Sequence, residues 1–315
     1  MPADSYILEN DGTGNFKDVT ESIAPDLLKI GMVTDALWCD YDNDGDEDLF
    51  ICGDWMPIRV FNNKNGFLTE HTEKLGFSHT NGFWNTLKKQ DLDNDGDLDL
   101  IAGNLGLNTQ LKGTKNKPVS LYINDFDHDG KLDHIITVFD GEKAYPIASR
   151  GEISRQLPYL KNKYPTHEDY KGKTVEDIFS TEQLSVALKL EVFETASLVF
   201  WNENTHFTAQ QLPLQVQFSP VYSILTVDVN HDGNTELLIG GNQHRAKPQT
   251  GIYAGSFGSM IKLISKHQYE VIPFSKSGFF INGEIRDMEK LTIKGEEIIL
   301  VARNNDLLKI FKINQ

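Results

Sequence analysis

The chain is poor in cysteine and in long apolar segments. Its 315 residues include two cysteines, Cys39 and Cys52, and no CxxC pair, so the sequence indicates no zinc site. No apolar run reaches the roughly 18 residues that a membrane-spanning helix needs, so we expect no transmembrane segment. The cysteines could form an extracellular disulfide, but they would not lie opposite each other in a simple hairpin. We therefore favour two buried free thiols.

Basic residues and catalytic motifs are also scarce. The chain has 30 lysines and arginines against 46 acidic residues, for a formal charge of −16. Nucleic-acid binding calls for a clustered basic face, so we expect no nucleic-acid partner. GxSxG, HExxH, Walker and strand-linked GxGxxG motifs are missing. We predict a protein that is not an enzyme, with a polysaccharide-cleaving enzyme as the alternative.

Much of the acidity lies in four loops with one shared pattern: 40–48 (loop 1), 91–99 (loop 2), 125–133 (loop 3) and 228–236 (loop 4). Oxygen-bearing side chains occupy positions 1, 3, 5 and 9, and glycine occupies position 6. Calcium takes about six to eight oxygen ligands in a flexible geometry, and a backbone carbonyl normally serves at position 7. The pattern predicts up to four calcium sites. Their positions 1, 3, 5, 7 and 9 are Asp40, Asp42, Asp44, Asp46 and Asp48; Asp91, Asp93, Asp95, Asp97 and Asp99; Asp125, Asp127, Asp129, Lys131 and Asp133; and Asp228, Asn230, Asp232, Asn234 and Glu236.

These loops are not EF-hands. An EF-hand needs glutamate at position 12 and a helix on each side. Position 12 is instead Ile51, Ala102, Ile136 or Ile239. Each loop is followed by a short apolar run bounded by turn-forming residues, which is typical of a buried strand. The sequence therefore predicts strand–metal–strand hairpins.

A calcium loop of this kind between two strands resembles the FG-GAP or VCBS repeats of integrin α-subunit propellers and bacterial surface proteins. The glycine-rich turns at 10–16 and 62–67, with a weaker copy at 202–207, resemble the family's outer-strand turn. From Gly103 to Asn305 the chain is similar to large secreted VCBS-repeat proteins of Bacteroidetes-type bacteria. The resemblance implies ions with a structural role and no enzymatic activity.

The repeat spacing suggests the domain organisation. The first loop aspartates lie at 40, 91, 125 and 228, so the spacings are 51, 34 and 103 residues. A propeller blade takes roughly 40–50 residues, so 51 fits one blade and 103 fits two, or one with an insertion. The spacing of 34 residues between loops 2 and 3 fits neither one blade nor two. We interpret loop 3 as joining strands within the blade begun near Gly82, or as part of a shortened blade. We predict one all-β domain over 1–315, a β-propeller of about five to seven four-stranded blades.

Residues 150–190 depart from the repeat pattern and carry helix signals. Thr174 is expected to cap a helix with Asp177 near its N3 position. We predict a helical insertion in the propeller. It is either a solvated element packed beside the blades or a partner-binding lid, since long insertions are often functional.

The resemblance also suggests where a ligand would bind. Metal loops between strands 1 and 2 would lie on one face, and the loops after strand 2 on the opposite face. These loops are rich in turn-forming residues, but their amide, aromatic and basic groups would also suit a glycan or an extended peptide. The candidate ligand-binding residues are Asp54, Trp55, Asn104, Asn108, Asn242, His244, Arg245, Arg303 and Asn304.

Together these features predict an extracellular or cell-surface calcium-binding propeller that acts as a binding or adhesion module for glycan or protein partners. The alternatives are the polysaccharide-cleaving enzyme and a structural spacer of a large surface protein. The chain opens with a blade-like segment rather than a leader peptide. We therefore expect it to be part of a longer exported protein with other domains.

Overall fold

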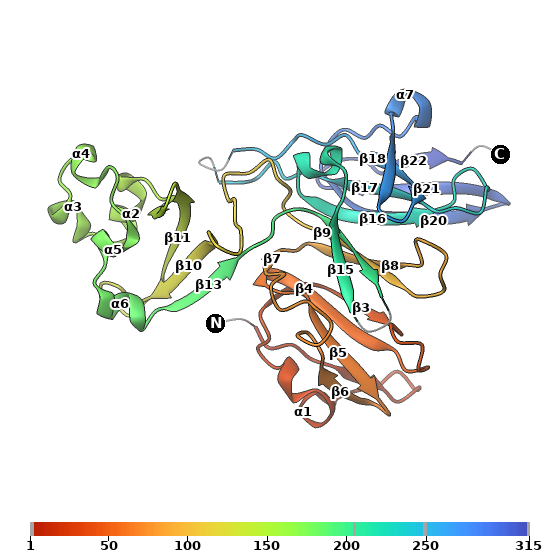
Figure 1. Cartoon of the computed structure of the whole chain (residues 1–315), viewed down its shortest axis with the longest axis horizontal. Helices are drawn as coiled ribbons and strands as arrows, with labels where there is room; N and C mark the ends of the chain where they lie inside the picture. Colours follow the sequence, from red (N-terminus) through yellow and green to blue (C-terminus); the bar gives the residue numbers. More distant parts are fainter. Residues whose placement is uncertain (1–2, 204–205, 248–250, 314–315) are drawn as a thin grey trace. The chain divides into compact units, whose positions relative to one another are not determined.

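The computed structural model describes residues 3–203, 206–247 and 251–313 (Figure 1). The chain folds into two compact units. Unit 1 consists of Met1–Gln110 and Thr195–Gln315, and unit 2 consists of Leu111–Glu194. Antiparallel sheets form the framework of both units, which confirms the predicted all-β class. The single domain expected over 1–315 thus encompasses two units.

Apart from a two-stranded sheet within residues 8–18, the described residues of unit 1 form four successive antiparallel sheets, numbered I to IV here. Sheets I, II and III have the four-stranded order expected of a propeller blade, and sheet IV has three strands. A short strand, β7 (Gly82–Phe83), also pairs with β4. The strands are β3 (Met32–Cys39), β4 (Asp48–Met56), β5 (Arg59–Lys64) and β6 (Phe67–Glu70) in sheet I; β8 (Thr86–Gln90), β9 (Asp99–Gly103), β14 (Leu198–Asn202) and β15 (Phe207–Gln211) in sheet II; β16 (Val221–Val227), β17 (Glu236–Gly241), β18 (Ser259–Ser265) and β19 (Gln268–Ile272) in sheet III; and β20 (Ile285–Ile293), β21 (Glu296–Arg303) and β22 (Lys309–Lys312) in sheet IV.

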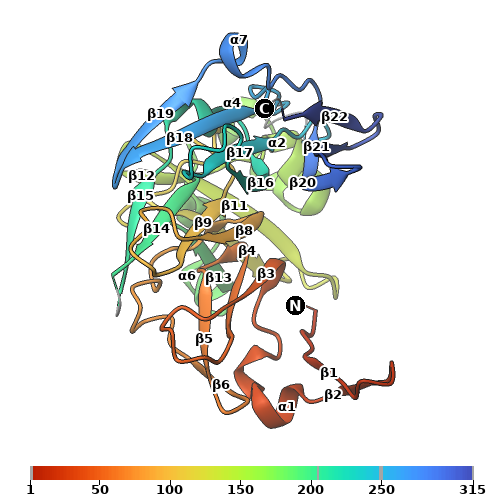
Figure 2. The same cartoon turned by 90° about the vertical axis from the view of Figure 1, so that its right-hand side faces the viewer.

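The first strands of successive sheets lie next to one another. β3 contacts β8, β8 contacts β16, and β16 contacts β20. Figure 2 shows these strands in the middle of unit 1, with the third and fourth strands farther out. Propeller blades have this radial order. Within the described residues no strand pairing joins sheet IV to sheet I, so ring closure and the blade count stay predictions.

In unit 1, the apolar runs after loops 1, 2 and 4 form second strands that are buried on both faces, whereas β11, after loop 3 in unit 2, alternates between buried and partly exposed residues. Leu100 and Ala102 of β9 belong to the core cluster shared with sheet I, and Ile101 between them belongs to the cluster shared with sheet III. In β17, Leu237 packs toward sheet II and Leu238 toward sheet IV. Successive residues of a strand point to opposite faces. A strand between two packed sheets therefore has no polar face, which explains why these runs are continuously apolar.

Unit 2 enters the chain after β9 and before β14, between the second and third strands of sheet II. Its own sheet has the order β12-β11-β10-β13, and loop 3 joins β10 to β11. The interpretation of loop 3 as part of the blade begun near Gly82 is therefore wrong. The short spacing of 34 residues between loops 2 and 3 reflects the passage from one unit to the other. The strands are β10 (Val119–Asn124), β11 (Asp133–Asp140), β12 (Lys143–Pro146) and β13 (Leu188–Val192).

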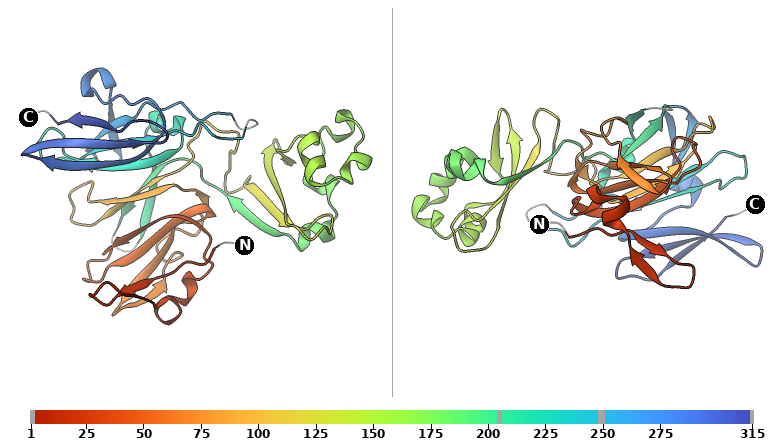
Figure 3. Two further views of the ribbon diagram at one scale, coloured as in Figure 1. Left: turned by 180° about the vertical axis from the view of Figure 1, so that it is seen from behind. Right: turned by 90° about the horizontal axis from the view of Figure 1, so that it is seen from below.

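Short helices lie between β12 and β13 along the chain, in the region where the helical insertion was predicted. They cover one face of the unit 2 sheet (Figure 3), where Ile153 packs with Phe126 and Ile135. Four of the five begin with a capping box, including the one predicted from Thr174 and Asp177. They are α2 (Arg150–Gln156), α3 (Leu160–Lys163), α4 (His167–Tyr170), α5 (Val175–Ile178) and α6 (Thr181–Ser185).

The glycine-rich turns expected from the sequence form hairpins. The turn at 10–16 joins β1 (Leu8–Asn10) to β2 (Phe16–Asp18), and the turn at 62–67 joins β5 to β6. The weaker copy at 202–207 joins β14 to β15, and its residues 204–205 lie outside the described part of the chain. The remaining helices are α1 (Thr20–Ile23), η1 (Pro25–Leu27), η2 (Leu214–Phe218) and α7 (Phe274–Ser277).

Cys39 and Cys52 are buried free thiols, as the sequence favoured. In the pairing of β3 with β4, Asp48 lies opposite Cys39 and Asp35 lies opposite Cys52. The two thiols therefore do not face each other. Burial raises the pKa of each thiol to about 12, so both are protonated and poor nucleophiles at neutral pH.

Candidate metal centre

Each acidic loop turns the chain sharply between two paired strands. The glycine at position 6 has a φ between 85° and 96° in all four loops, which explains the requirement for glycine there. Position 4 is also left-handed, with φ between 56° and 61°. Asparagine and histidine tolerate this conformation better than most residues. The residues at position 4 are Asn43, Asn94, His128 and His231.

The aspartate at position 1 folds the loop around its own carboxylate. In loop 1, Asp40 accepts hydrogen bonds from the backbone N–H groups of Asp44 and Gly45, both at 3.1 Å. In loop 3, Asp125 accepts the corresponding bonds from Asp129 and Gly130 at 3.0 and 2.9 Å. The position 1 carboxylate is thus held at the centre of the turn.

Three of the loops bring three carboxylates together. In each, the oxygens of positions 1, 3 and 9 lie within 4.8 Å of one another. Like charges at this separation repel, so a cation bound among them would be strongly favoured. These groups can hold a metal ion, as the sequence predicted for these positions. They are Asp40, Asp42 and Asp48; Asp91, Asp93 and Asp99; and Asp125, Asp127 and Asp133.

The other predicted ligands serve the loop backbone or neighbouring groups. The position 5 side chains Asp44, Asp95 and Asp129 lie outside the clusters, and each accepts the backbone N–H of position 7 at 2.8–3.0 Å. At position 7, Asp46 accepts the backbone N–H of Asn65, and Asp97 accepts the side-chain amide of Asn43. Lys131 bonds to Asp129.

The carboxylate at position 9 is the most buried member of each cluster. Asp48 and Asp99 are 0% and 2% exposed, and burial raises their pKa values to about 6 and about 7. Burial also raises the pKa of Asp133 and of Glu236. A buried carboxylate is costly to ionise without a counter-charge, which a cation at the cluster would supply.

Loop 2 gives the clearest fit to a cation. One side-chain oxygen of Asp91 and one of Asp93, Oδ1 in each case, are buried and have no hydrogen-bond partner. Buried polar atoms in folded proteins are normally paired, so two such oxygens in one cluster call for a ligand. Asp93 uses its other oxygen, Oδ2, in an ion pair with Lys266 at 3.1 Å. Asp91, Asp93 and Asp99 would hold the ion.

Loop 4 does not form such a cluster. Its carboxylates are Asp228, Asp232 and Glu236, with the amide Asn230 at position 3. Asp232 is paired with Lys262 of β18. Asn234, at position 7, donates both its backbone N–H and its side-chain amide to Asp232.

The sequence pattern missed the residues that flank the loops from the third strands. Asn62 donates to both Asp42 and Asp48 of loop 1, at 3.2 and 3.0 Å. The backbone N–H of Asn202 donates to Asp99 at 2.9 Å, and Lys262 occupies the corresponding region of sheet III. These residues follow each loop at a distance that varies with the intervening turns, so the nine-residue pattern gave no signal for them.

Among the candidate ligand-binding residues, two amides are buried and hold the backbone. Asn104 is 0% exposed and accepts the N–H groups of Phe83 and Leu105 at 3.1 and 2.8 Å. Asn242, 3% exposed and left-handed at φ 81°, donates to the carbonyl of Ser256 at 2.6 Å. Both amides fix turns.

A buried glutamate joins two of the candidate loops. Glu284 accepts the backbone N–H of His244 at 2.7 Å and the side-chain amide of Asn304 at 2.9 Å. Arg303 is bound locally, to Asp306 at 2.7 Å and to the carbonyl of Leu307. Glu284 therefore ties the loop after β17 to the loop after β21, and the sequence did not single it out.

The remaining candidates differ in accessibility. Trp55 is half-buried, with its ring edge-on to Phe83 at 4.9 Å, and half-buried Asp54 has a pKa raised by burial. Asn108, His244 and Arg245 are exposed. Asn304 is exposed as well, and the role of these four residues in binding stays a prediction.

The sheets and loops define a repeat protein of antiparallel sheets whose hairpin loops carry carboxylate clusters able to hold metal ions. Residues 40–102 match the family model of the FG-GAP-like repeat, which supports a relation of this part of the chain to the FG-GAP/VCBS repeats. The match runs from the first residue of loop 1 into β9, so it contains loops 1 and 2. Comparison with curated proteins finds no match. In the described ranges, no helix is both long and apolar enough to cross a membrane.

Proposed function

We propose that the chain is a calcium-stabilised, non-catalytic binding module. Ions in loops 1, 2 and 3 fix the hairpins of a propeller-like array of sheets, and the array presents loops to a glycan or protein partner outside the cell. The observation that carries the proposal is the convergence of three carboxylates in each of these loops.

The ligand set favours calcium over other metals. All members of the clusters are carboxylates, without histidine or cysteine, so the sites suit a hard cation. Magnesium demands a near-ideal octahedron and keeps several waters, whereas calcium accepts irregular oxygen cages. Extracellular modules bind calcium with a Kd of about 10⁻⁴ to 10⁻³ M, so the sites would fill where calcium is plentiful. This supports a location outside the cell.

Calcium titration tests the metal part of the proposal. We expect isothermal titration calorimetry to detect binding at loops 1, 2 and 3, and magnesium to bind much more weakly. Variants Asp40→Asn, Asp91→Asn and Asp125→Asn should each remove one ion. Absence of calcium binding to a folded wild-type protein would contradict the proposal.

The binding part rests on the exposed loops that follow the second strands. Asn108, His244 and Arg245 offer amide, imidazole and guanidinium groups to an incoming partner. Such groups bond well to sugar hydroxyls or to the backbone of an extended peptide. The family resemblance supports a display role rather than a reaction.

Ligand screening in calcium distinguishes the alternatives. We expect binding on a glycan array or to a peptide library, and expect Arg245→Ala to weaken it while the exposed Lys312→Ala, in sheet IV, does not. A reducing-end release assay on the same glycans should be negative, and release of sugar ends would favour the polysaccharide-cleaving enzyme. Blank results in both assays would favour the structural spacer.

A further inference from the structure

Loop 4 has the same backbone turn as the other loops. The backbone N–H groups of Gly233 and Asp232 donate to Asp228 at 2.9 and 3.2 Å, as their counterparts do in loops 1 and 3. Its position 9 residue, Glu236, is 2% exposed and accepts the N–H of Val229 at 3.0 Å. The difference between loop 4 and the others therefore lies in what its side-chain oxygens contact.

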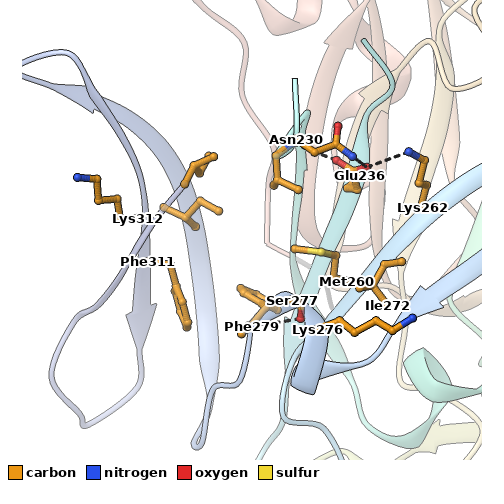
Figure 4. Close-up of a pocket in the computed structure, with 14 residues that line it drawn as sticks. Asn230, Glu236, Met260, Lys262, Ile272, Lys276, Ser277, Phe279, Phe311 and Lys312 are labelled. Atoms are coloured by element: carbon orange, nitrogen blue, oxygen red, sulfur yellow. Dashed lines mark hydrogen bonds and ion pairs between the residues drawn. The ribbon is translucent and has the colours of Figure 1, made fainter. Parts of the chain in front are cut away.

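A lysine from the third strand lies against those oxygens. Lys262 is the register partner of Glu236 in the pairing of β17 with β18. Its ammonium group contacts the carboxylate of Asp232 and lies 3.8 Å from Oε1 of Glu236. Figure 4 shows the Lys262 side chain directed toward Glu236. The side chains of Lys262 and Asp232 are 25% and 37% exposed, so water screens their pairing in part, whereas Glu236 beside them is buried.

Asn230 adds hydrogen-bond donors at the position where loops 1 to 3 have a carboxylate. Its Nδ2 donates to Asp232 at 3.2 Å and lies 3.5 Å from Oε1 of Glu236. Its Oδ1 is used by the backbone N–H of Asp232 at 2.9 Å. A metal ion binds oxygen lone pairs, and the amide of Asn230 here faces the carboxylates with N–H groups.

The space beside loop 4 offers little to a metal ion. A cavity of 480 Å³ adjoins Asn230, Glu236 and Lys262. Much of its wall is apolar, including Met260 and Phe279 (Figure 4). Such a wall supplies no oxygen ligands to replace the missing carboxylate at position 3.

In loop 2, by contrast, no lysine side chain in the part of the chain that the structure describes contacts the inner carboxylate oxygens. A lysine is also present there, but Lys266 pairs with the outer oxygen of Asp93 and with Glu203, at 3.1 and 3.2 Å. The inner oxygens of Asp91 and Asp93 keep no partner. Among the described residues, no side-chain oxygen of loop 4 is buried without a partner.

We propose that Lys262 is the built-in cation of loop 4, so that this loop takes no metal ion and stays folded without calcium. The contrast with loops 1 to 3 rests on the proposed calcium function, whereas the role of Lys262 does not. A calcium ion entering loop 4 would meet a positive charge already bound to its ligands. Loss of calcium should therefore loosen the hairpins of sheets I and II and of unit 2, and leave the first hairpin of sheet III intact.

Hydrogen–deuterium exchange of the full chain tests the contrast. In chelator, peptides covering 40–48, 91–99 and 125–133 should exchange faster than in millimolar calcium. Peptides covering 228–236 should exchange at the same rate in both. Slower exchange at 228–236 on adding calcium would overturn the proposal.

A variant pair tests the lysine directly. In chelator, Lys262→Met should speed exchange at 228–236 several-fold, because the charged partner of Asp232 and of the buried Glu236 is lost. Lys312→Met, which removes a more exposed pair with Glu296 at 2.6 Å, should leave that segment unchanged. Unchanged exchange at 228–236 in folded Lys262→Met would overturn the role of Lys262. If no loop of the wild type responds to calcium, the proposed calcium function fails, and this variant pair still decides what Lys262 does.

Discussion

Loops 2 and 4 have the same backbone turn at the same place in two neighbouring sheets. The carboxylate oxygens of the two loops nevertheless differ in whether they have hydrogen-bond or ion-pair partners. Loop 2 leaves two buried carboxylate oxygens without partners. In loop 4, Lys262 and Asn230 bond to the carboxylates. We infer that the shared pattern specifies the shape of the turn, whereas Asn230 within loop 4 and Lys262 on the third strand together take the place of the metal ion.

Removing calcium from the whole protein should have the largest effect on this comparison. A ligand that binds only the folded state stabilises it by about 2.7 kcal/mol per site at a hundredfold excess over Kd. With loops 1, 2 and 3 occupied, we expect chelation to lower the melting temperature strongly in differential scanning calorimetry. Calcium should restore it and magnesium should not. An unchanged melting temperature would remove the basis for treating loop 2 as a metal site.

A matched pair of substitutions at position 1 should sharpen the comparison. Asp91→Asn and Asp228→Asn change the same kind of residue, and each native carboxylate accepts the N–H of its position 6 glycine. We expect the calcium-dependent gain in unfolding free energy to fall by about 2.7 kcal/mol in Asp91→Asn and to stay unchanged in Asp228→Asn. Thermal melts with and without calcium measure both. Equal losses in the two variants would show that loop 4 also holds calcium.

A lysine placed beside loop 1 should convert it toward the state of loop 4. Asn62 bonds to Asp42 and Asp48, so Asn62→Lys would bring an ammonium group to the cluster. We expect this variant to bind one ion fewer in equilibrium dialysis, with a smaller loss of stability in chelator than the wild type shows. Asn62→Gln, which keeps an amide, should retain the ion. If Asn62→Lys still binds as many calcium ions as the wild type, a lysine on the third strand does not prevent a loop from binding calcium.

The smallest effect concerns the link between neighbouring loops. Asn43 of loop 1 donates to Asp97 of loop 2 at 2.8 Å, so occupation of one loop should help to order the other. Asn43→Ala should lower calcium affinity at loop 2 by a few-fold, in keeping with a hydrogen bond worth about 0.5–1.5 kcal/mol. His128→Ala makes the same kind of change at position 4 of loop 3, in unit 2, and serves as the control. Equal effects of both variants on loop 2 would exclude the link.

The sequence predicted the features that are encoded locally. The glycine at position 6, the apolar second strands and the capping box of Thr174 with Asp177 depend on residues a few positions apart. The place of unit 2 depends on strand pairing across a long stretch of chain, β9 with β14 and β10 with β13, which no local pattern reveals. The role of Lys262 could not be predicted from the sequence for the same reason, because its position opposite Glu236 follows from the register of β17 and β18.

The position of unit 2 also determines the order in which sheet II can form during synthesis. β8 and β9 leave the ribosome first, but β14 and β15 follow only after all of Leu111–Glu194 has been made. Until then the nascent β8–β9 ribbon has an unpaired edge on β9, together with apolar side chains such as Ile101 that the mature protein buries. Exposed strand edges invite pairing with other chains. During synthesis of Leu111–Glu194 the edge of β9 therefore stays open to pairing with other chains.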